Sequence, residues 1–454
     1  APGDYDLAGF AVGAAKRGGL LPHETRQPVK SACPNQARTR PSRMPSMNRR
    51  SAILTLGALP FALRAAPTPL PVAAVVTEYR TNSHADVIIG KILEGWKQDG
   101  GPGPSLKLVA MYVDQFPKPE LSRALAKKHG FPITKTIGEA ITLGTGKVQV
   151  AGVLSIGEHG KYPFTEKTRQ HMYPRRRFFD AIADTLEKCG KPVPVFNDKH
   201  LAYNWKDAKH IYDRARKLKI PFMAGSSLPV AWRLPALKLP LGTDVEFGMG
   251  VGYAGLESYG FHALEGFQCI FERRKGGETG VASVRAVAGE AIWKTLADKK
   301  WSFDLLLAAL RGSGVTMAVD EIRRRLTAKA TIYLMEYRDG RRGAVAMANG
   351  IAREFAVALK LRGQAKPFVN HIWLQDRKPY RHFEHLLRGI EPMIHTGQPT
   401  YPVERTLLTT GILDRVMQSV AEGGRLFKTP ELAIRYQPTD WAFANWQGKF
   451  PRPL

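Results

Sequence analysis

Short apolar runs alternate with amphipathic stretches along the chain from residue 72 to residue 225. The apolar runs have no polar face, which is typical of strands buried inside a parallel sheet. Between them, apolar residues recur at helical spacing; after His84, for example, Val87, Ile88, Ile92 and Leu93 share one face. Strands that alternate with helices in this way predict a doubly wound parallel sheet.

The predicted strands of this sheet cover 72–76, 106–113, a short segment near 133, 148–156, 193–196 and 221–224. The predicted helices begin near 84, 119, 139, 175 and 206. We therefore expect residues 72–225 to form a doubly wound α/β domain. In such a sheet, ligands bind at the carboxyl ends of the strands.

The pattern changes after Gly225, where strands follow one another without helical crossovers. Strands are predicted at 281–287, 330–337, 343–348, 354–361 and 368–374, and a helix at 303–310. Asp339 and Gly340 predict a hairpin turn between two of these strands. We expect residues 226–436 to form an α+β substrate and oligomerisation domain with an open, mainly antiparallel sheet, followed by a tail at 437–454.

The first residues differ from the rest of the chain. Residues 1–46 are rich in Gly, Pro and Arg without periodicity, so we expect a non-native or disordered extension, with synthesis beginning near Met47 or Met44. Residues 47–66 hold twin arginines, an apolar run and small residues at the end, a pattern that resembles a twin-arginine-type signal peptide. The alternative is a lone transmembrane anchor, for which the apolar run is short. We expect a periplasmic or secreted protein with no stable membrane span after processing.

The chain is strongly basic, with 67 Lys and Arg against 40 Asp and Glu and a formal net charge of +27. The basic residues are scattered through helical segments and do not alternate with aromatic residues, as they would on a nucleic-acid stacking platform. We therefore interpret the charge as a solvated basic surface and expect no nucleic-acid partner. The three cysteines are too few and too widely spaced for a disulfide framework or a cysteine-based metal site.

Two positions carry the strongest candidate chemistry. Lys199 follows the apolar run at 193–196, where a strand gives way to a helix. Because lysine is costly to bury, a lysine at this edge usually has a partner or a function; a salt-bridged loop lysine is the alternative. His262 and Glu265 lie three residues apart, hence on one face if the segment is helical, and a buried structural histidine is the alternative there.

The order of elements and three local patterns resemble the Gfo/Idh/MocA family of glucose–fructose oxidoreductases and inositol dehydrogenases. The patterns are Asp198-Lys199-His200 where the family has Glu-Lys-Pro, residues 260–265 (Gly-Phe-His-Ala-Leu-Glu) where it tends to have Gly-x-His-x-x-Asp, and a late loop and closing helix at 397–419. The resemblance spans roughly residues 72–436. It implies a Rossmann domain joined to a substrate domain, with NAD or NADP as cofactor and a carbohydrate-like small molecule as substrate.

The resemblance also implies roles for single residues. Lys199 would be the general acid/base, His262 would bind the substrate or share its proton, and Glu265 would orient that histidine. The cofactor would be held by side chains from the turns that follow the strands: Arg80, Thr81, Ser83, Asp114, Glu158, His159 and Asp198. A homo-oligomer is expected by analogy with other substrate domains of this kind.

Several positions depart from the family pattern. The first turn, 77–83, contains no glycine, although a dinucleotide site needs glycines there so that the backbone approaches the pyrophosphate. Glu78 adds a negative charge, which Arg80 and nearby hydroxyls would offset only in part. The residue four before His262 is Ser258 and not Asp, with Glu257 beside it.

Other interpretations of single residues stay open. Asp114 as a helix cap and His159 as a turn residue are alternatives to cofactor binding. His84, Asp86 and the three residues His159, His262 and Glu265 do not have a recognised metal-ligand spacing, so no metal site is expected.

Two functions follow from these patterns. The first is an exported oxidoreductase that transfers a hydride between NAD or NADP and a sugar or polyol hydroxyl. The second is a non-catalytic secreted binding protein that kept the fold but lost the dinucleotide, an interpretation favoured by the missing glycines and by Ser258. A lyase or hydrolase built on the same site is a third interpretation.

Overall fold

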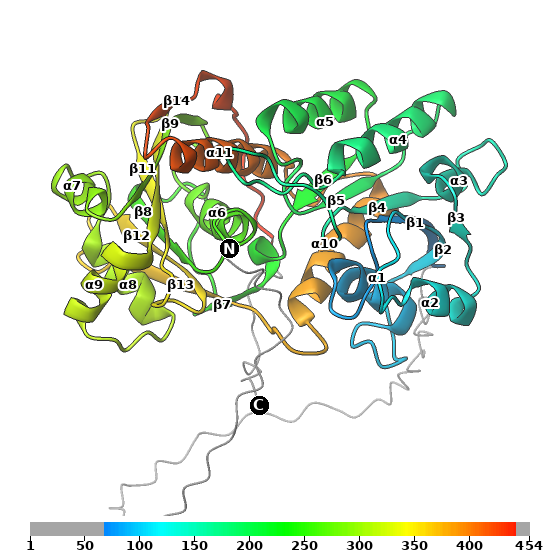
Figure 1. Ribbon diagram of the computed structural model, residues 1–454, viewed down its shortest axis with the longest axis horizontal. Helices are drawn as coiled ribbons and strands as arrows, with labels where there is room; N and C mark the ends of the chain where they lie inside the picture. The colour runs from blue at the N-terminus through cyan, green and yellow to red at the C-terminus, as the bar shows by residue number, and fades with distance from the viewer. Residues whose placement is uncertain (1–67, 442–454) are drawn as a thin grey trace, which may run out of the picture. The chain divides into compact units, whose positions relative to one another are not determined.

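The computed structural model describes residues 68–441 (Figure 1). The expected extension at 1–46, the signal-like segment at 47–66 and residues 442–454 of the expected tail lie outside the described residues. The described residues belong to one compact unit. Within 68–441, no helix combines the length and the apolar character that crossing a lipid bilayer requires.

The first half of the described chain forms a six-stranded parallel sheet with the strand order β3-β2-β1-β4-β5-β6. Its strands are β1 (Leu70–Val76), β2 (Leu106–Val113), β3 (Ile133–Thr134), β4 (Gly152–Ile156), β5 (Val195–Asp198) and β6 (Phe222–Gly225). The strand order changes direction between β1 and β4, which places ligand binding at the carboxyl ends of these strands. This sheet confirms the predicted doubly wound architecture.

Helices cover both faces of this sheet. One face packs against α3 (Ile137–Thr142), α4 (Arg175–Lys188) and α5 (Trp205–Lys217). The other face packs against α1 (His84–Glu94) and α2 (Ser122–His129), and α10 (Arg381–Thr396) joins them from far along the chain (Figure 1). The late part of the chain therefore contributes directly to the core of the first sheet.

The second sheet has eight strands in the order β14-β9-β10-β11-β8-β12-β13-β7. Neighbouring strands are antiparallel except for β8 and β11, which are parallel. The predicted hairpin turn is present between β10 and β11, where Gly340 has a φ of 80°. The strands are β7 (Trp232–Leu234), β8 (Val245–Gly252), β9 (Val281–Ala288), β10 (Thr331–Tyr337), β11 (Arg342–Met347), β12 (Phe355–Leu361), β13 (Phe368–Trp373) and β14 (Phe427–Lys428). This sheet confirms the predicted open, mainly antiparallel sheet.

Helices of the same chain also cover both faces of the second sheet. α6 (Ser258–Phe271) and α11 (Glu404–Ala421) pack on one face. α7 (Ala291–Ala297), α8 (Phe303–Gly312) and α9 (Val319–Lys329) pack on the other face, where Leu306, Leu310 and Ile322 are fully buried (Figure 1). A second copy that paired face to face through this sheet would first have to displace these three helices.

Glycines on one face of β8 determine how closely α6 approaches the sheet. Gly248, Gly250 and Gly252 occupy alternate positions of the strand and face side chains of α6. A Cβ atom added to Gly252 would lie 2.7 Å from the Cβ atom of Ala263 on α6, which is far inside van der Waals contact. Because Ala263 is next to His262, this close packing also fixes the position of the candidate histidine.

We expect Gly252→Ala to lower the free energy of unfolding by about 1–3 kcal/mol, because the added methyl group overpacks the interface between β8 and α6. Chemical denaturation measures the loss. The control is Gly255→Ala, since a Cβ atom there would meet only the rotatable hydroxyl of Ser258, at 3.1 Å; it should change stability by less than about 0.5 kcal/mol. Equal effects of the two substitutions would contradict the close packing of α6.

Candidate functional site

The carboxyl edge of β5 brings together the two residues that carry the predicted chemistry. Lys199 follows β5, and His262 lies on α6. The Nζ atom of Lys199 is 2.7 Å from the Nε2 atom of His262, within hydrogen-bond distance. Lys199 is buried and His262 is half-buried. An ammonium group from the first sheet and an imidazole from the second half of the chain therefore meet directly, while their catalytic roles stay predictions.

The backbone of Lys199 is held in an unusual conformation. Its φ of 68° lies in the left-handed region, which residues other than glycine rarely adopt. The N–H of Lys199 donates to the carbonyl of Gly225, the last residue of β6, at 3.1 Å, and this bond stabilises the turn. Such a conformation costs about 1 kcal/mol or more and is found where the surroundings impose it, often at functional sites.

A buried carboxylate anchors the ammonium group of Lys199. Glu158 lies two residues after β4; one of its oxygens is 3.3 Å from Lys199 Nζ, and the other accepts a hydrogen bond from the guanidinium of Arg175. Burial alone would raise the pKa of Glu158, but the cations of Lys199 and Arg175 hold that pKa well below its usual range. Glu158 is therefore an anion that neutralises two buried cations, while its expected role as a cofactor ligand stays a prediction.

The hydrogen bonds around His262 define its protonation. Burial lowers the pKa of His262 well below its ordinary value, and the adjacent Lys199 cation lowers it further, so the ring is neutral at neutral pH. Because the Lys199 ammonium donates to Nε2, the ring proton lies on Nδ1, which is 2.6 Å from the hydroxyl oxygen of Ser226. Lys199, His262 and Ser226 thus form a continuous hydrogen-bonded chain.

Glu265 does not orient His262, and this corrects the predicted role. Its carboxylate is buried and accepts hydrogen bonds from the hydroxyls of Thr409 at 2.7 Å and Thr406 at 3.2 Å, and from the N–H of Ser226 at 3.3 Å. Both ring nitrogens of His262 already have other partners. Glu265 instead holds the turn that carries Ser226, and Ser226 in turn holds the imidazole ring.

The turn between β1 and α1 is stabilised by its own side chains. Arg80 Nε donates to Glu78 at 2.6 Å, which neutralises the negative charge of this turn. Ser83 is the N-cap of α1: its buried hydroxyl accepts hydrogen bonds from the N–H groups of Asp86 at 3.3 Å and Arg80 at 3.2 Å. Its expected role as a cofactor ligand stays a prediction. The side chain of Thr81 is exposed to solvent.

Two histidines lie beside the same turn: His84 is the first residue of α1, and His159 follows β4. Asp198 accepts a hydrogen bond from His84 Nδ1 at 2.6 Å, so its carboxylate is paired within the protein, and its expected role at the cofactor stays a prediction. His159 Nδ1 lies 3.4 Å from the guanidinium of Arg80, whereas its Nε2 is buried without a hydrogen-bond partner. Burial lowers the pKa of His159 to about 3, so the ring stays neutral. An unpaired buried ring nitrogen is a group that a polar ligand can satisfy.

Asp114 follows β2 where the sequence places it, but three protein groups already bind its carboxylate. The hydroxyl of Tyr112 donates to Oδ1, and the hydroxyl of Tyr162 and the guanidinium of Arg177 donate to Oδ2, each at 2.7 Å. Burial would raise the pKa of Asp114, but these donors hold that pKa below its ordinary value. The predicted binding of a ribose would therefore have to compete with partners from the chain itself.

Glu257 precedes α6 but does not replace the aspartate that the family has near its histidine. Its Oε2 accepts a hydrogen bond from the N–H of His171 at 2.8 Å, and its Oε1 is 3.9 Å from Nε2 of His200. The same nitrogen of His200 lies 3.0 Å from the guanidinium of Arg175. Burial raises the pKa of Glu257 to about 7. This carboxyl group therefore faces the buried pair of His200 and Arg175, not His262.

Sequence reasoning missed two residues of this site, Arg175 and Ser226. Arg175 begins a run of three arginines at the start of α4. The helix dipole disfavours positive charge at the N-terminal end of a helix. Three arginines in this position therefore indicate that carboxylate partners lie close by. Ser226 directly follows β6 at the same edge as Lys199. Its position at the carboxyl end of a strand is the feature that could have identified it as a site residue.

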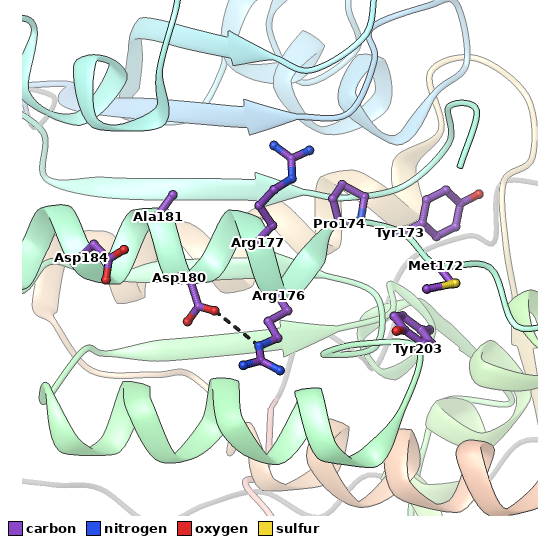
Figure 2. A pocket seen from close by; sticks show the side chains of 9 residues that line it. All are labelled: Met172, Tyr173, Pro174, Arg176, Arg177, Asp180, Ala181, Asp184 and Tyr203. Atoms are coloured by element: carbon purple, nitrogen blue, oxygen red, sulfur yellow. Dashed lines mark hydrogen bonds and ion pairs between the residues drawn. The ribbon is translucent and has the colours of Figure 1, made fainter. Parts of the chain in front are cut away.

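Neither Lys199 nor His262 lines the surface depression of about 680 Å³ whose lining residues are drawn in Figure 2. Its lining comes from the first turns of α4 and from the segments around Met172 and Tyr203. The charged groups there pair with one another or with neighbours, as Arg176 does with Asp180 at 3.4 Å. Nothing in this lining indicates which ligand would bind, so the depression plays no part in the proposed site.

Metal ligation and disulfide bonding find no support in residues 68–441. No group of three or more His, Cys, Asp or Glu in this part of the chain is arranged to hold a metal ion. Cys189 and Cys269 are free thiols, and Cys269 is buried.

No protein-family model and no curated protein matches the chain. Among solved structures, GenD2 from gentamicin A biosynthesis, in complex with NAD, matches 80% of this chain and 96% of its own, with a TM-score of 0.51 and 14% identity. The fold is that of the Gfo/Idh/MocA dehydrogenases.

Two further structures match less well. The apo scyllo-inositol dehydrogenase from Lactobacillus casei has a TM-score of 0.49 and 10% identity over 80% of this chain and 98% of its own. A putative myo-inositol dehydrogenase from Sinorhizobium meliloti 1021 has a TM-score of 0.47 and 13% identity over 79% of this chain and 99% of its own. At these values the likeness concerns the fold and says nothing about substrate.

A nicotinamide dinucleotide would meet different surroundings at its two ends. At the nicotinamide end, His159 offers an unpaired ring nitrogen beside the edge that carries Lys199. At the diphosphate, Arg80, whose side chain is 29% exposed, supplies positive charge where other proteins use glycine N–H groups. At the adenosine end, Asp114 is already paired. One unpaired buried nitrogen and one partly exposed guanidinium thus suit a polar, anionic ligand such as the nicotinamide and diphosphate groups, whereas donors of the chain occupy Asp114.

We expect Glu158→Gln to lower the free energy of unfolding at pH 7 by about 3–5 kcal/mol, because two buried cations lose their anion. The pKa of Glu158 is lower in the folded state than in the unfolded state, so its stabilisation is present at neutral pH and is lost as the pH falls below about 4. The stabilities of the variant and the wild type should therefore converge toward acid pH. Urea unfolding between pH 3 and pH 7 measures both effects.

The control for this substitution is Glu422→Gln, which removes a half-exposed carboxylate paired with Arg425 on the surface. Exposed ion pairs contribute about 0–1 kcal/mol, so this variant should be nearly as stable as the wild type. A loss below about 1 kcal/mol for Glu158→Gln at pH 7 would show that the buried contact does not hold the site together.

Proposed function

We propose that the protein is an oxidoreductase that transfers a hydride between NAD or NADP and a hydroxyl group of a sugar or polyol. The observation that carries this proposal is the 2.7 Å contact between Lys199 and His262 at the carboxyl edge of the parallel sheet. GenD2, whose structure contains NAD, supports the proposal through its fold.

The cofactor would supply the hydride acceptor next to the carbinol carbon. Three residues of this chain would hold it: His159 through its unpaired Nε2, Arg80 through its guanidinium near the diphosphate, and Thr81 through its exposed hydroxyl. The hydroxyl-bearing substrate would lie beside Lys199 and His262, since oxidation needs a proton acceptor within hydrogen-bond reach of the reacting oxygen.

Lys199, assisted by His262, would transfer the proton to or from the substrate oxygen. In the reductive direction, the Lys199 ammonium donates a proton to the carbonyl oxygen of the substrate. In the oxidative direction, the amine left by that step accepts the hydroxyl proton as the hydride leaves the carbon and the C=O bond forms. Glu158, 3.3 Å from Lys199, stabilises the ammonium form, and His262 shares its proton by hydrogen bonding.

The second candidate is a binding protein without turnover. It is favoured by the turn at 77–83, which has no glycine, and by Asp114, whose carboxylate is occupied by three donors of the chain. Such a protein would keep the carbohydrate site and lack the dinucleotide.

Dinucleotide content distinguishes the two functions. We expect NAD or NADP either to be released when the purified protein is denatured or to bind on titration, as measured by mass spectrometry and absorbance. With myo-inositol and glucose as probe substrates, Lys199→Met should lower kcat by about 10²–10⁴-fold, because the positioned acid/base is lost.

Lys206→Met, at an exposed lysine of α5, is the matched control and should keep the activity of the wild type. Unchanged turnover in Lys199→Met, with the fold verified by circular dichroism, would remove Lys199 from the mechanism. A protein that neither carries nor binds a dinucleotide would be the binding protein.

We also propose that the chain is exported as a folded protein through the twin-arginine-type segment at 47–66, which makes the mature protein periplasmic or secreted. Peptide mapping of the N-terminus in the producing organism should find mature chains that begin just after Ala66. Mature chains that retain residues 47–66 would show that this segment is not a cleaved signal.

A further inference from the structure

The segment 157–173 between β4 and α4, here called the strap, crosses the ends of β1 and β2. The hydroxyl of Thr77, directly after β1, donates to the backbone carbonyl of Glu158 at 2.6 Å. Gln115, two residues after β2, bonds twice to the backbone of Lys161, with distances of 3.0 Å and 2.9 Å. The strap is therefore tied to the edge of the sheet where a dinucleotide is bound in Rossmann-like folds.

The strap also delivers a hydroxyl group to the acidic residue at the end of β2. Tyr162 donates its phenolic hydrogen to Asp114 Oδ2 at 2.7 Å. In dinucleotide-binding folds, the acidic residue in this place accepts a hydrogen bond from the adenosine ribose. Tyr162 thus presents to Asp114 the same group, a hydroxyl donor, that a ribose would present.

Three more contacts hold this arrangement. Arg177, from the first turn of α4, donates to the same oxygen of Asp114 at 2.7 Å. At the other end of the strap, the N–H of His171 donates to Glu257 at 2.8 Å, and the ring of His171 stacks on Phe164 with a centroid distance of 4.2 Å. The strap is therefore fixed at both ends, and releasing Asp114 means breaking specific hydrogen bonds.

We propose that Tyr162 occupies the place of the adenosine ribose hydroxyl, so that the strap competes with the adenosine half of a dinucleotide for Asp114. This inference rests on the proposed function, because it concerns the same cofactor. It makes Tyr162 a residue that sets the affinity for the cofactor without touching the reacting atoms. It also explains how Asp114 keeps a buried charge when no ligand is present: the chain supplies the donors itself.

Tyr162→Phe tests the proposal, because it removes the hydroxyl and keeps the ring. We expect NAD⁺, whose adenosine ribose has a free 2′-hydroxyl, to bind this variant about tenfold more tightly than the wild type in calorimetric titrations, since a hydrogen bond to a carboxylate no longer has to be broken. The matched control is Tyr112→Phe, which removes a different donor from the same carboxylate but lies on β2, outside the strap. The affinity of Tyr112→Phe for NAD⁺ should stay within about twofold of that of the wild type.

Hydrogen exchange gives a second measurement that does not depend on activity. Adding NAD⁺ to the wild type should speed exchange of the backbone N–H of Lys161, which the strap contact to Gln115 protects. Unchanged or weaker binding by Tyr162→Phe, with NAD⁺ bound by the wild type, would overturn this inference and leave the proposed function standing. If the wild type, Tyr162→Phe and Tyr112→Phe all fail to bind NAD⁺ and NADP⁺, both this inference and the proposed function are overturned.

Discussion

The candidate site depends on one buried ionic contact, in which Glu158 holds Lys199 and Arg175 together. The three groups come from the turn after β4, the turn after β5 and the first residue of α4, so the contact fixes these segments relative to one another. A charge left unpaired in the interior is strongly destabilising, so the loss of any one of these three groups is expected to destabilise the whole contact. Through its bond to His262, Lys199 extends the same contact to α6 and the second half of the chain.

Much of the fold could be predicted because its signals are local. The strand at 106–113, the start of α1 at His84 and the hairpin at Gly340 follow from hydrophobic period and turn chemistry, and each is present. The sequence did not predict β8, because its three glycines weaken the pattern expected of a strand. Close packing against α6 requires these glycines, and that packing depends on residues far away in the sequence. In the site, strand ends pointed to Lys199, and the resemblance added His262. The partners of Glu158 and Asp114 come from distant segments and needed the tertiary structure.

The helices α7–α9 have a consequence for assembly. With side chains such as Leu306, Leu310 and Ile322, they bury an apolar face of the second sheet that would otherwise require another partner or favour aggregation. Their presence means that this sheet is covered on both faces by residues 68–441 alone. The homo-oligomer expected by analogy would therefore have to form through a different surface.

A ligand at the carboxyl edge of the first sheet competes with bonds that the protein already makes. A glycine-rich turn offers unpaired N–H groups, whereas here Glu78 is paired with Arg80, and Asp114 with Tyr162. The free energy of binding is then only the difference between the contacts that the ligand forms and the internal contacts that it breaks. The Nε2 atom of His159 has no such competitor among the described residues, so a polar ligand that bonds to it would displace no hydrogen bond of the chain. On the proposal that the strap competes for Asp114, the free energy needed to move Tyr162 from this carboxylate is part of what binding a dinucleotide would cost.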